Sequence, residues 1–491
     1  MLQSAMSEGA RSESGSTGVA PAGLLRDAVL GGPGAAVAGG LRAGVLGWLA
    51  GGEAVRAALA SEGHVDARRR VLTGEVTVAA VLGLCLFSGE GYDSVLARVV
   101  PAVAPGAAVP TASALSQART RLSGQPLKAL FAATADRQVT EAPGCGAFGL
   151  ELTAFDGTVF DLAATEEVAA QFAVPSGGRH PQARLVTLAC CGTRRLRAAA
   201  LGSYATSEQE LVEQLLPALT PGTLNLADRN FFSMARWIRA AETGAELAWR
   251  VKNGARSLPA KTTAVLPDGS SLLRLRESDS MLSRRRAEAG DRTLPRLPDT
   301  AARLVEFDVL ITDEAGKTRR SRFRVLTTLT DHRAYPARRI AAVYAERWQV
   351  ELAYYRIKVT LRGPGTVLRG QTPALARQEV WGLLVVYNAL CDLATRAAVG
   401  LGVDPDEISF VAVLRRTRTQ IDADTHRHGT RPGTDAVQAL TVAIAAHPAT
   451  EPVDNAPAPA LRTNDVPNEP ARSATRSTSS RQIYPKPHED S

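Results

Sequence analysis

The chain has little of what marks secreted, membrane-embedded or thiolate-metal proteins. Its 491 residues include only five cysteines and seven histidines, and no two cysteines form a CxxC pair. Five cysteines cannot all pair, so we expect buried thiols in a reducing cytoplasm. No apolar run reaches the roughly 20 residues that a membrane span requires, because Arg, Glu, Gly or Pro interrupts each candidate. The N-terminal MLQSAMSEGARSESGSTG carries acids and has no apolar segment after a basic start, so we expect no secretory signal.

Positive charge, in contrast, is in excess. Lys and Arg number 57 against 49 Asp and Glu, which gives a formal net charge of +8. This balance favours a polyanionic partner. An Arg-rich, Ala-rich composition also follows from genomic base bias, so the charge alone leaves the nature of the partner open.

Both ends of the chain differ in composition from its middle. Residues 1–22 are rich in Gly, Ser and Ala, and residues 449–491 are rich in Pro, Ser, Thr and Asn, so we expect both to be disordered. Helical periodicity predicts an all-helical N-terminal domain between them, at 23–140. The rest is predicted as the first part of an α/β core (146–245), a β-rich insertion (246–332), the final core helices (333–400) and a C-terminal helical region (401–448).

The apolar period changes to that of strands from Phe148 onward. In FGLELTAFDGTVFDL the DG pair predicts a hairpin turn, and ARLVTLACCGTRRLRAAALGSY predicts two further strands. Ser207 and Glu210 form a capping box at the start of a helix, and TLNLAD predicts a short buried strand. More strands follow, and then the long helical patterns PARRIAAVYAERWQVELAYYRIKV and PALARQEVWGLLVVYNALCDLATRAAV. Strands alternating with helices predict an α/β fold.

Two aspartates stand where predicted strands end. Asp156 lies in LTAFDGT and Asp228 in LNLADRN. Ligands of open α/β sheets gather at the carboxyl ends of strands, and two carboxylates brought together there favour a divalent cation between them. Oxygen ligands without nearby His or Cys suit Mg²⁺ better than Zn²⁺. Ordinary turn chemistry explains either aspartate taken singly, because Asp is common in turns and at helix caps.

A polar stripe on one predicted helix favours a site over two unrelated turns. Tyr344, Arg347, Glu351 and Lys358 have the spacing Y-x2-R-x3-E-x6-K. At about 100° per residue they fall at roughly 0°, 300°, 340° and 320°, on one narrow face. All four side chains can therefore reach one ligand. The alternative is a solvated face on which Arg347 and Glu351 form an i,i+4 ion pair.

This set of residues resembles the insertion sequence 4 family of bacterial DDE transposases. The resemblance rests on the Tyr-Arg-Glu-Lys spacing, the DGT around Asp156 and the DRNFFS that begins at Asp228, and it covers about residues 148–395. It implies an α/β fold with a ribonuclease H-like catalytic core interrupted by a β-rich insertion. It also implies cut-and-paste transposition of DNA, by an enzyme that cuts the ends of an insertion element and joins them to target DNA.

The resemblance further implies roles for individual residues. Asp156, Asp228 and Glu351 would be catalytic and would hold two Mg²⁺ ions, for which Mn²⁺ would substitute. Two such ions activate the attacking oxygen and stabilise the leaving oxygen of a phosphodiester. Tyr344, Arg347 and Lys358 would hold phosphates near the cut. The partner would be double-stranded DNA, both terminal inverted repeats and target, bound by a homodimer in the bacterial cytoplasm at the nucleoid, without a membrane.

Other candidate DNA contacts have weaker support. Trp348 suits stacking on an unpaired base and, equally, plain helix packing. Arg229 follows Asp228 directly. Arg320, Arg322 and Arg324 alternate along a predicted strand, which suits a DNA backbone track or an exposed basic strand. The N-terminal helices are candidates for binding the element ends.

Two other functions are compatible with the same sequence. One keeps the fold but makes the chain a structure-selective nuclease that cuts without strand transfer. The other is a non-catalytic DNA-binding protein derived from a transposase. The intact acidic residues argue against the second of these.

Overall fold

The computed structural model describes residues 47, 52–64, 71–104, 106–135, 145–254, 258–312, 318–426, 433–446 and 481–485. All of them belong to one compact unit, Ala38–Ser491. The N-terminal segment 1–22, expected to be disordered, lies outside the described residues, as does most of 449–491.

The described residues between 52 and 135 form helices, as the sequence predicts. Thr73 and Thr111 begin two of them by accepting hydrogen bonds from the amides of Val76 and Ala114. The helix that starts after Thr73 is buried on nearly every side, and it lies against a long helix from the C-terminal half. The bounds are α3 Gly52–Ser61, α4 Gly74–Leu86, α5 Tyr92–Val103, α6 Ala112–Leu122 and α7 Gln125–Ala135.

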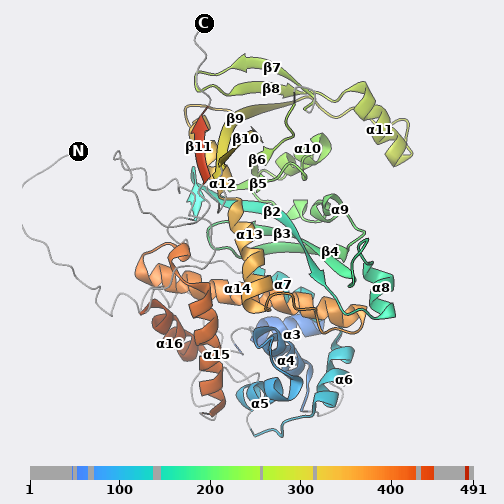
Figure 1. Cartoon of the computed structure of the whole chain (residues 1–491), viewed down its shortest axis with the longest axis vertical. Coiled ribbons are helices and arrows are strands. Elements are labelled where there is room, and N and C mark those ends of the chain that lie inside the picture. Colours follow the sequence, from blue (N-terminus) through green and yellow to red (C-terminus); the bar gives the residue numbers. More distant parts are fainter. Residues whose placement is uncertain are drawn as a thin grey trace, which may run out of the picture. The chain divides into compact units, whose positions relative to one another are not determined.

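A single mixed sheet occupies the centre of the structure, in the order β4-β3-β2-β5-β6-β10-β9-β8-β7 (Figure 1). β2, β3 and β4 are antiparallel, while β5 and β6 add parallel to β2 and to each other. This is the ribonuclease H-like core that the resemblance implies. The bounds are β1 Gly146–Ala147, β2 Leu150–Asp161, β3 Gln182–Cys190, β4 Leu196–Ser203, β5 Thr223–Ala227, β6 Glu246–Arg250, β7 Ala260–Val265, β8 Ser271–Leu275, β9 Thr300–Thr312, β10 Thr318–Thr327 and β11 Arg481–Pro485.

The two faces of this sheet bury separate apolar clusters. Ala154 and Phe160 of β2 point into one cluster, which also contains residues of the N-terminal helices. Phe155 points the other way, into a cluster with Trp237 and Trp249. This alternation follows from the two-residue period of a strand. Trp249 is fully buried and donates to Asn225 at 2.9 Å, so it belongs to the core.

The DG pair at Asp156 and Gly157 does not form a hairpin turn, and that prediction is wrong. β2 runs unbroken through both residues and pairs with β3 along its length, with Asp156 opposite Thr187 and Gly157 opposite Val186. Gly157 is not among the glycines with positive φ. Turn statistics describe local preference, which the continuous pairing of β2 with β3 overrides here.

The β-rich insertion continues the core sheet. β10 pairs antiparallel with β6, so the insertion strands extend the sheet past the fifth core strand. β6, which the sequence places in the insertion, pairs parallel with β5 and thus completes the core. β11 lies inside the segment 449–491 that we expected to be disordered. It pairs with β9 at Phe307–Ile311, beyond the point where the shorter β8 ends.

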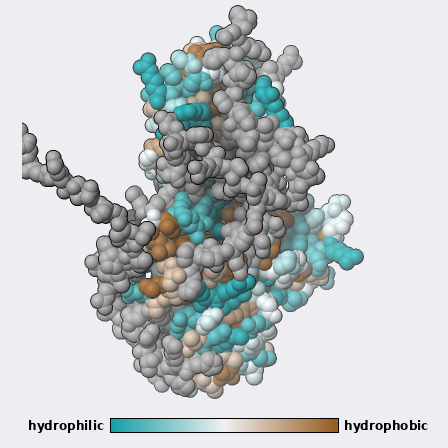
Figure 2. Space-filling view, turned by 60° about the vertical axis from the view of Figure 1, so that its left-hand side comes forward, coloured by the Kyte–Doolittle hydropathy of each residue, from teal (hydrophilic) through white to brown (hydrophobic). Residues whose placement is uncertain are grey.

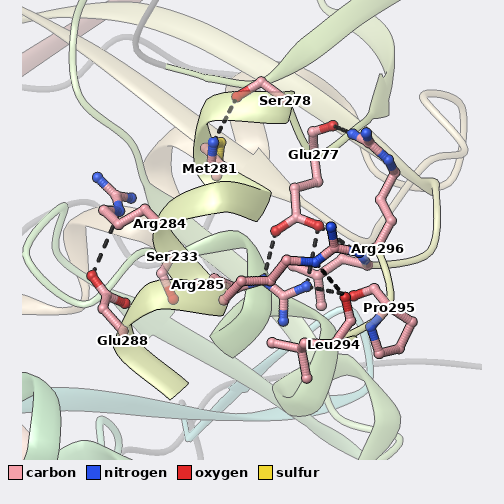
Figure 3. A network of polar contacts seen from close by, with 12 residues as sticks. Ser233, Glu277, Ser278, Met281, Arg284, Arg285, Glu288, Leu294, Pro295 and Arg296 are labelled. Carbon is pink, nitrogen blue, oxygen red and sulfur yellow. Dashed lines mark hydrogen bonds and ion pairs between the residues drawn. The ribbon is translucent and has the colours of Figure 1, made fainter. Parts of the chain in front are cut away.

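The insertion also contains a helix, α11 Asp279–Ala289, which includes Arg284–Arg286. Ser278 caps its start, and a polar network fixes it to the following segment (Figure 3). The side chain of Glu277 is fully buried, and both of its oxygens accept from Arg285, at 2.6 and 3.1 Å. Arg296 donates to the backbone carbonyl of Glu277, and the Leu297 amide donates to the Glu277 carboxylate at 2.9 Å.

The remaining helices surround the core. The longest helix, α14 Pro373–Leu401, is apolar and long enough to cross a membrane by composition, but 89% of its apolar stretch is buried within the fold. It is thus a core helix, and it contacts both α4 and α7. The other bounds are α8 Glu166–Phe172, α9 Glu208–Glu213, η1 Leu216–Ala218, α10 Met234–Glu242, α12 Ala337–Ala345, α13 Trp348–Tyr355, η2 Arg356–Leu361, η3 Pro405–Glu407, α15 Phe410–His426 and α16 Gly433–Ala445.

Candidate active site

Asp156 and Asp228 lie at the same end of two adjacent strands. The parallel register pairs Ala154 of β2 with Leu226 of β5, so each aspartate stands two residues past this pair. Asp228 directly follows the end of β5. Asp156 lies inside β2 rather than at its exit, but β5 has ended at that level, and the carboxylate is only partly covered.

The helix with the polar stripe is divided into three consecutive parts. α12 ends at Ala345, α13 begins at Trp348, and the chain tightens through Glu346 and Arg347 between them. From Arg356 to Leu361 the chain forms a π-helix, η2. The sequence predicts a single continuous helix here, because helical periodicity does not register one extra residue in a turn.

Arg347 and Glu351 form the expected i,i+4 ion pair, with 2.6 Å between Arg347 Nη2 and Glu351 Oε1. The same guanidinium also faces the sheet, with its Nη1 3.8 Å from Asp156 Oδ2. Burial alone would lower the pKa of Arg347, but Tyr344 and the charges of Glu351, Asp156 and Asp228 raise it. Arg347 therefore lies between Asp156 and Glu351 and is also within the electrostatic influence of Asp228.

The surroundings of Asp156 disfavour the charged form of its carboxyl group. Burial raises its pKa to about 6, against the opposing effects of Arg347 and of a hydrogen bond from the Gly157 amide. Glu351 and Glu208 raise it further by repulsion. Asp156 thus has less compensating positive charge than its burial requires, which favours binding a further cation.

Arg250 is a site residue that the sequence did not point to. It ends β6, and its Nη1 lies 3.4 Å from Asp228 Oδ1. Its guanidinium also lies over the Phe323 ring, 3.7 Å from the centroid. The pairing follows from the register, which sets Ala227 beside Trp249. Local sequence holds no signal for it, because it depends on which strands are neighbours.

Two tyrosines anchor the helix to the strand ends. Tyr344 is buried, and its hydroxyl donates to the carbonyl of Ala227 at 3.2 Å. The expected phosphate contact of Tyr344 is therefore replaced by a contact that holds the residue before Asp228. Tyr354 donates to the carbonyl of Asp156 at 2.5 Å and lies 2.8 Å from Thr187. Sequence analysis missed Tyr354, although it falls at about 280° on the same helical projection, beside the stripe.

Lys358 lies further along β2. Its Nζ is 3.4 Å from Thr158 Oγ1, and burial, with the nearby Arg362, lowers its pKa. The π-helix still directs Lys358 to the strand that carries Asp156, so the stripe stays on one side. Trp348 is half-buried beside Arg347, and Arg229 is exposed next to Asp228.

The alternating arginines of β10 share one strand face but are partly neutralised. Arg320 and Arg322 both pair with Asp308 of β9, the latter at 3.3 Å. Arg324 pairs with Glu306 at 3.1 Å. The sequence could not show these pairs, because they join residues from opposite strands. The face is thus a mixed one, not a purely cationic track.

Comparison with known proteins identifies the family. The family model described as insertion element 4 transposase N-terminal matches residues 42–132, and the transposase DDE domain matches residues 147–389. The transposase InsG for insertion sequence element IS4 of Escherichia coli (strain K12) is 28% identical over 371 residues, which cover 73% of this chain and 78% of that protein. The chain belongs to the insertion sequence 4 family of DDE transposases.

Two further relatives are more distant. The putative transposase InsZ of the same strain is 26% identical over 205 residues, covering 40% of this transposase and 67% of that protein. The cryo-EM structure of the piggyBac transposase synaptic complex with hairpin DNA covers 86% of this transposase and 87% of that chain, with 8% identity and a TM-score of 0.41. That score is too low to support an argument. The family establishes a transposase, an enzyme of DNA transposition, and favours neither a nuclease without strand transfer nor a non-catalytic descendant.

DDE transposase domains depend on divalent metal ions, and the acids of this transposase suit them chemically. Asp156, Asp228 and Glu351 offer only carboxylate oxygens, the hard ligands that Mg²⁺ and Mn²⁺ prefer. In the described part of the chain no three His, Cys, Asp or Glu side chains are close enough to hold one ion together. Arg347 and Arg250 lie against these carboxylates instead. The donor set thus fits divalent ions, provided that Arg347 moves from between Asp156 and Glu351.

Proposed function

We propose that this transposase cuts DNA at the ends of an insertion element and joins those ends to target DNA, using Asp156, Asp228 and Glu351 as its catalytic metal-binding residues. The observation that carries the proposal is that Arg347 lies between Asp156 of β2 and Glu351 of α13, while Asp228 stands level with Asp156 at the end of β5. Residues 195 positions apart in the sequence meet there, which turn chemistry does not explain.

Asp156, Asp228 and Glu351 would together hold two Mg²⁺ or Mn²⁺ ions. Bound there, the ions would activate the attacking oxygen and stabilise the leaving oxygen of the phosphodiester. Arg347, once displaced from the carboxylates, would bind a phosphate near the cut, and Lys358 would bind another. Tyr344 and Tyr354 would keep the two strand ends fixed through their carbonyl contacts.

The partner we propose is double-stranded DNA, both terminal inverted repeats and target, bound by a homodimer in the bacterial cytoplasm. The net charge of +8 supports a polyanion. The coloured residues in Figure 2 include both hydrophilic stretches and groups of hydrophobic residues. Recognition of the element ends would fall to the N-terminal domain, 23–140, whose described part is helical.

Further contacts would lie around the acidic cluster. Arg229 is exposed beside Asp228 and is placed to bind a phosphate. Trp348 would stack on an unpaired base next to Arg347. Arg320, Arg322 and Arg324 would each have to exchange a carboxylate of β9 for a DNA phosphate, so we expect them to contribute less than Arg229.

The test uses the purified full chain with DNA that carries the element's own ends, in Mn²⁺. We expect nicked or hairpin ends and then joined products, and we expect Glu351→Gln to bind the ends without cutting them. Bound but uncut ends with the unaltered chain would refute catalysis. Cut ends that are never joined would indicate the nuclease alternative, and unchanged cleavage by Glu351→Gln would remove the role given to that residue.

A further inference from the structure

A fourth acidic residue lies on the side of β2 that Gly157 faces. Glu208 is the first residue of α9, which Ser207 and Glu210 begin with a capping box. A Cβ atom at Gly157 would lie 2.5 Å from Glu208 Oε1 and 2.8 Å from its Cδ. Gly157 directly follows Asp156, and its backbone needs no positive φ. Glycine at this position therefore admits the Glu208 carboxylate to the strand.

The other oxygen of Glu208 binds the segment that follows the second aspartate. Asn230, two residues after Asp228, donates from Nδ2 to Glu208 Oε2 at 2.8 Å. The neighbouring Gln209 donates to the Asn230 carbonyl at 3.1 Å. One carboxylate thus contacts the backbone beside Asp156 and holds the loop that begins at Asp228.

The charge of Glu208 is not balanced by an arginine. Among the described residues it forms no ion pair, unlike Asp156, Asp228 and Glu351. Arg184 lines the same open groove, together with Ser207, Gln209 and Asn230. Its guanidinium is engaged elsewhere, donating to the Thr206 carbonyl at 2.7 Å and lying over the Tyr204 ring. The groove therefore contains one carboxylate and one guanidinium that do not form an ion pair with each other.

We propose that Glu208 is a positioning residue of this active site, which fixes the Asp228 loop against the Asp156 strand through Asn230 and Gly157 and thereby strengthens the binding of divalent ions. This inference rests on the proposed function. Groups one step removed from metal ligands typically change metal affinity by about 10- to 100-fold when they are lost. Glu208 acts at that distance, since its carboxylate faces Gly157 and Asn230 and not the stripe on α13.

The test measures Mn²⁺ binding by the full chain, through the electron paramagnetic resonance of free Mn²⁺, alongside Mn²⁺-dependent cleavage and thermal unfolding. Glu208→Ala removes the contacts with Asn230 and Gly157, whereas Glu208→Gln keeps the shape and can still accept from Asn230. For Glu208→Ala we expect the Mn²⁺ dissociation constant to rise about tenfold, with the Mn²⁺ concentration for half-maximal cleavage rising more than kcat falls, and we expect Glu208→Gln to restore most of this loss. Glu166→Ala is the matched control, because Glu166 is likewise the first residue of a short helix, α8, and is exposed.

Gly157→Ala supplies an independent arm. The added methyl would push the flexible Glu208 carboxylate away, so this variant should weaken Mn²⁺ binding as Glu208→Ala does. Because both changes remove the same contact, the double variant should be no weaker than either single one. Additive losses, or a Glu208→Ala variant that binds Mn²⁺ like Glu166→Ala, would overturn the inference. Retained cleavage in Asp156→Asn would instead overturn the proposed function.

Discussion

Two of the places where acidic residues meet arginines in this transposase, one in the insertion and one in the core, show opposite results. In the insertion, Glu277 is fully buried but accepts two hydrogen bonds from Arg285 and one from the Leu297 amide. Burial would raise its pKa, yet these partners lower it overall. In the core, burial raises the pKa of Asp156 to about 6, and Arg347 at 3.8 Å does not offset it. In the insertion, charged partners stabilise the fold. In the core, the Asp156 carboxylate has too few positive or hydrogen-bonding partners to offset its burial.

The largest expected effect is loss of catalysis in the core. Asp156→Asn and Glu351→Gln should each reduce DNA cleavage on the order of 10⁴-fold, as removal of one member of a catalytic set does. Thermal unfolding should show that both variants stay folded, because Asn at 156 removes a buried charge. If either variant cleaved DNA within tenfold of the rate of the unaltered chain, the catalytic role proposed for the core carboxylates would be wrong.

In the insertion the large effect falls on stability. Glu277→Ala leaves Arg285 without its carboxylate, and breaking a buried pair costs about 3 kcal/mol of unfolding free energy. Chemical denaturation measures this loss. Glu288→Ala is the control, since Glu288 is exposed and pairs only with Arg284 at 3.7 Å, so a change of about 0.5 kcal/mol or less is expected. Equal losses in both variants would show that the Glu277 network is no anchor.

The two acids should also respond to pH with opposite signs. Asp156 has a raised pKa, so its contribution to stability is greatest at low pH and declines as pH rises toward about 6. Glu277 has a lowered pKa, so its contribution is present above pH 4.5 and is lost as pH falls. Stability curves of Asp156→Asn and Glu277→Gln, each compared with the unaltered chain, should diverge in these opposite directions.

Protons should compete with metal at the core site alone. Below pH 6, Mn²⁺ affinity should fall by up to about tenfold per pH unit, because Asp156 must lose its proton to bind the ion. Above pH 6 the affinity should level off. Glu277→Gln should leave this profile unchanged, and a profile that is flat from pH 5 to 8 would contradict the assignment of Asp156.

The smallest expected effect concerns DNA contacts. Arg229→Ala should reduce the salt dependence of DNA binding by about one phosphate contact. Arg322→Ala should change it less, because Arg322 is already paired with Asp308. Binding titrations at several salt concentrations measure both slopes. A larger change for Arg322 would place DNA along β10.

Much of this architecture could be predicted from the sequence because its signals are local. The capping box at Ser207, the buried strand before Asp228 and the long helix of α14 all follow from periodicity and turn chemistry. The stripe on α12 and α13 indicated the right face, because helical spacing decides which side chains point together.

The features that the sequence did not predict depend on contacts between segments that are far apart in the chain. The predicted hairpin turn at Asp156 and Gly157 is absent. Glycine at 157 instead leaves room for the carboxylate of Glu208, which is 51 positions away in the sequence. Arg250 could not be assigned to the site without the order of the strands. Tyr344 was expected to meet DNA, but its hydroxyl finds a backbone carbonyl inside the fold. In each case the contact joins residues that are far apart in the sequence, so local sequence patterns could not predict it.

The pairing of β10 with β6 bears on how this transposase can change over evolution. Val325–Thr327 supply the partners of Ala248–Arg250, so the insertion closes an edge that the core alone would leave open. A related transposase that lacked the whole insertion would expose this edge of β6 to pairing with strands of other chains. The strand next to the core therefore has to be inherited with it, whereas β7, at the far end of the sheet order and exposed along its length, can vary at lower risk.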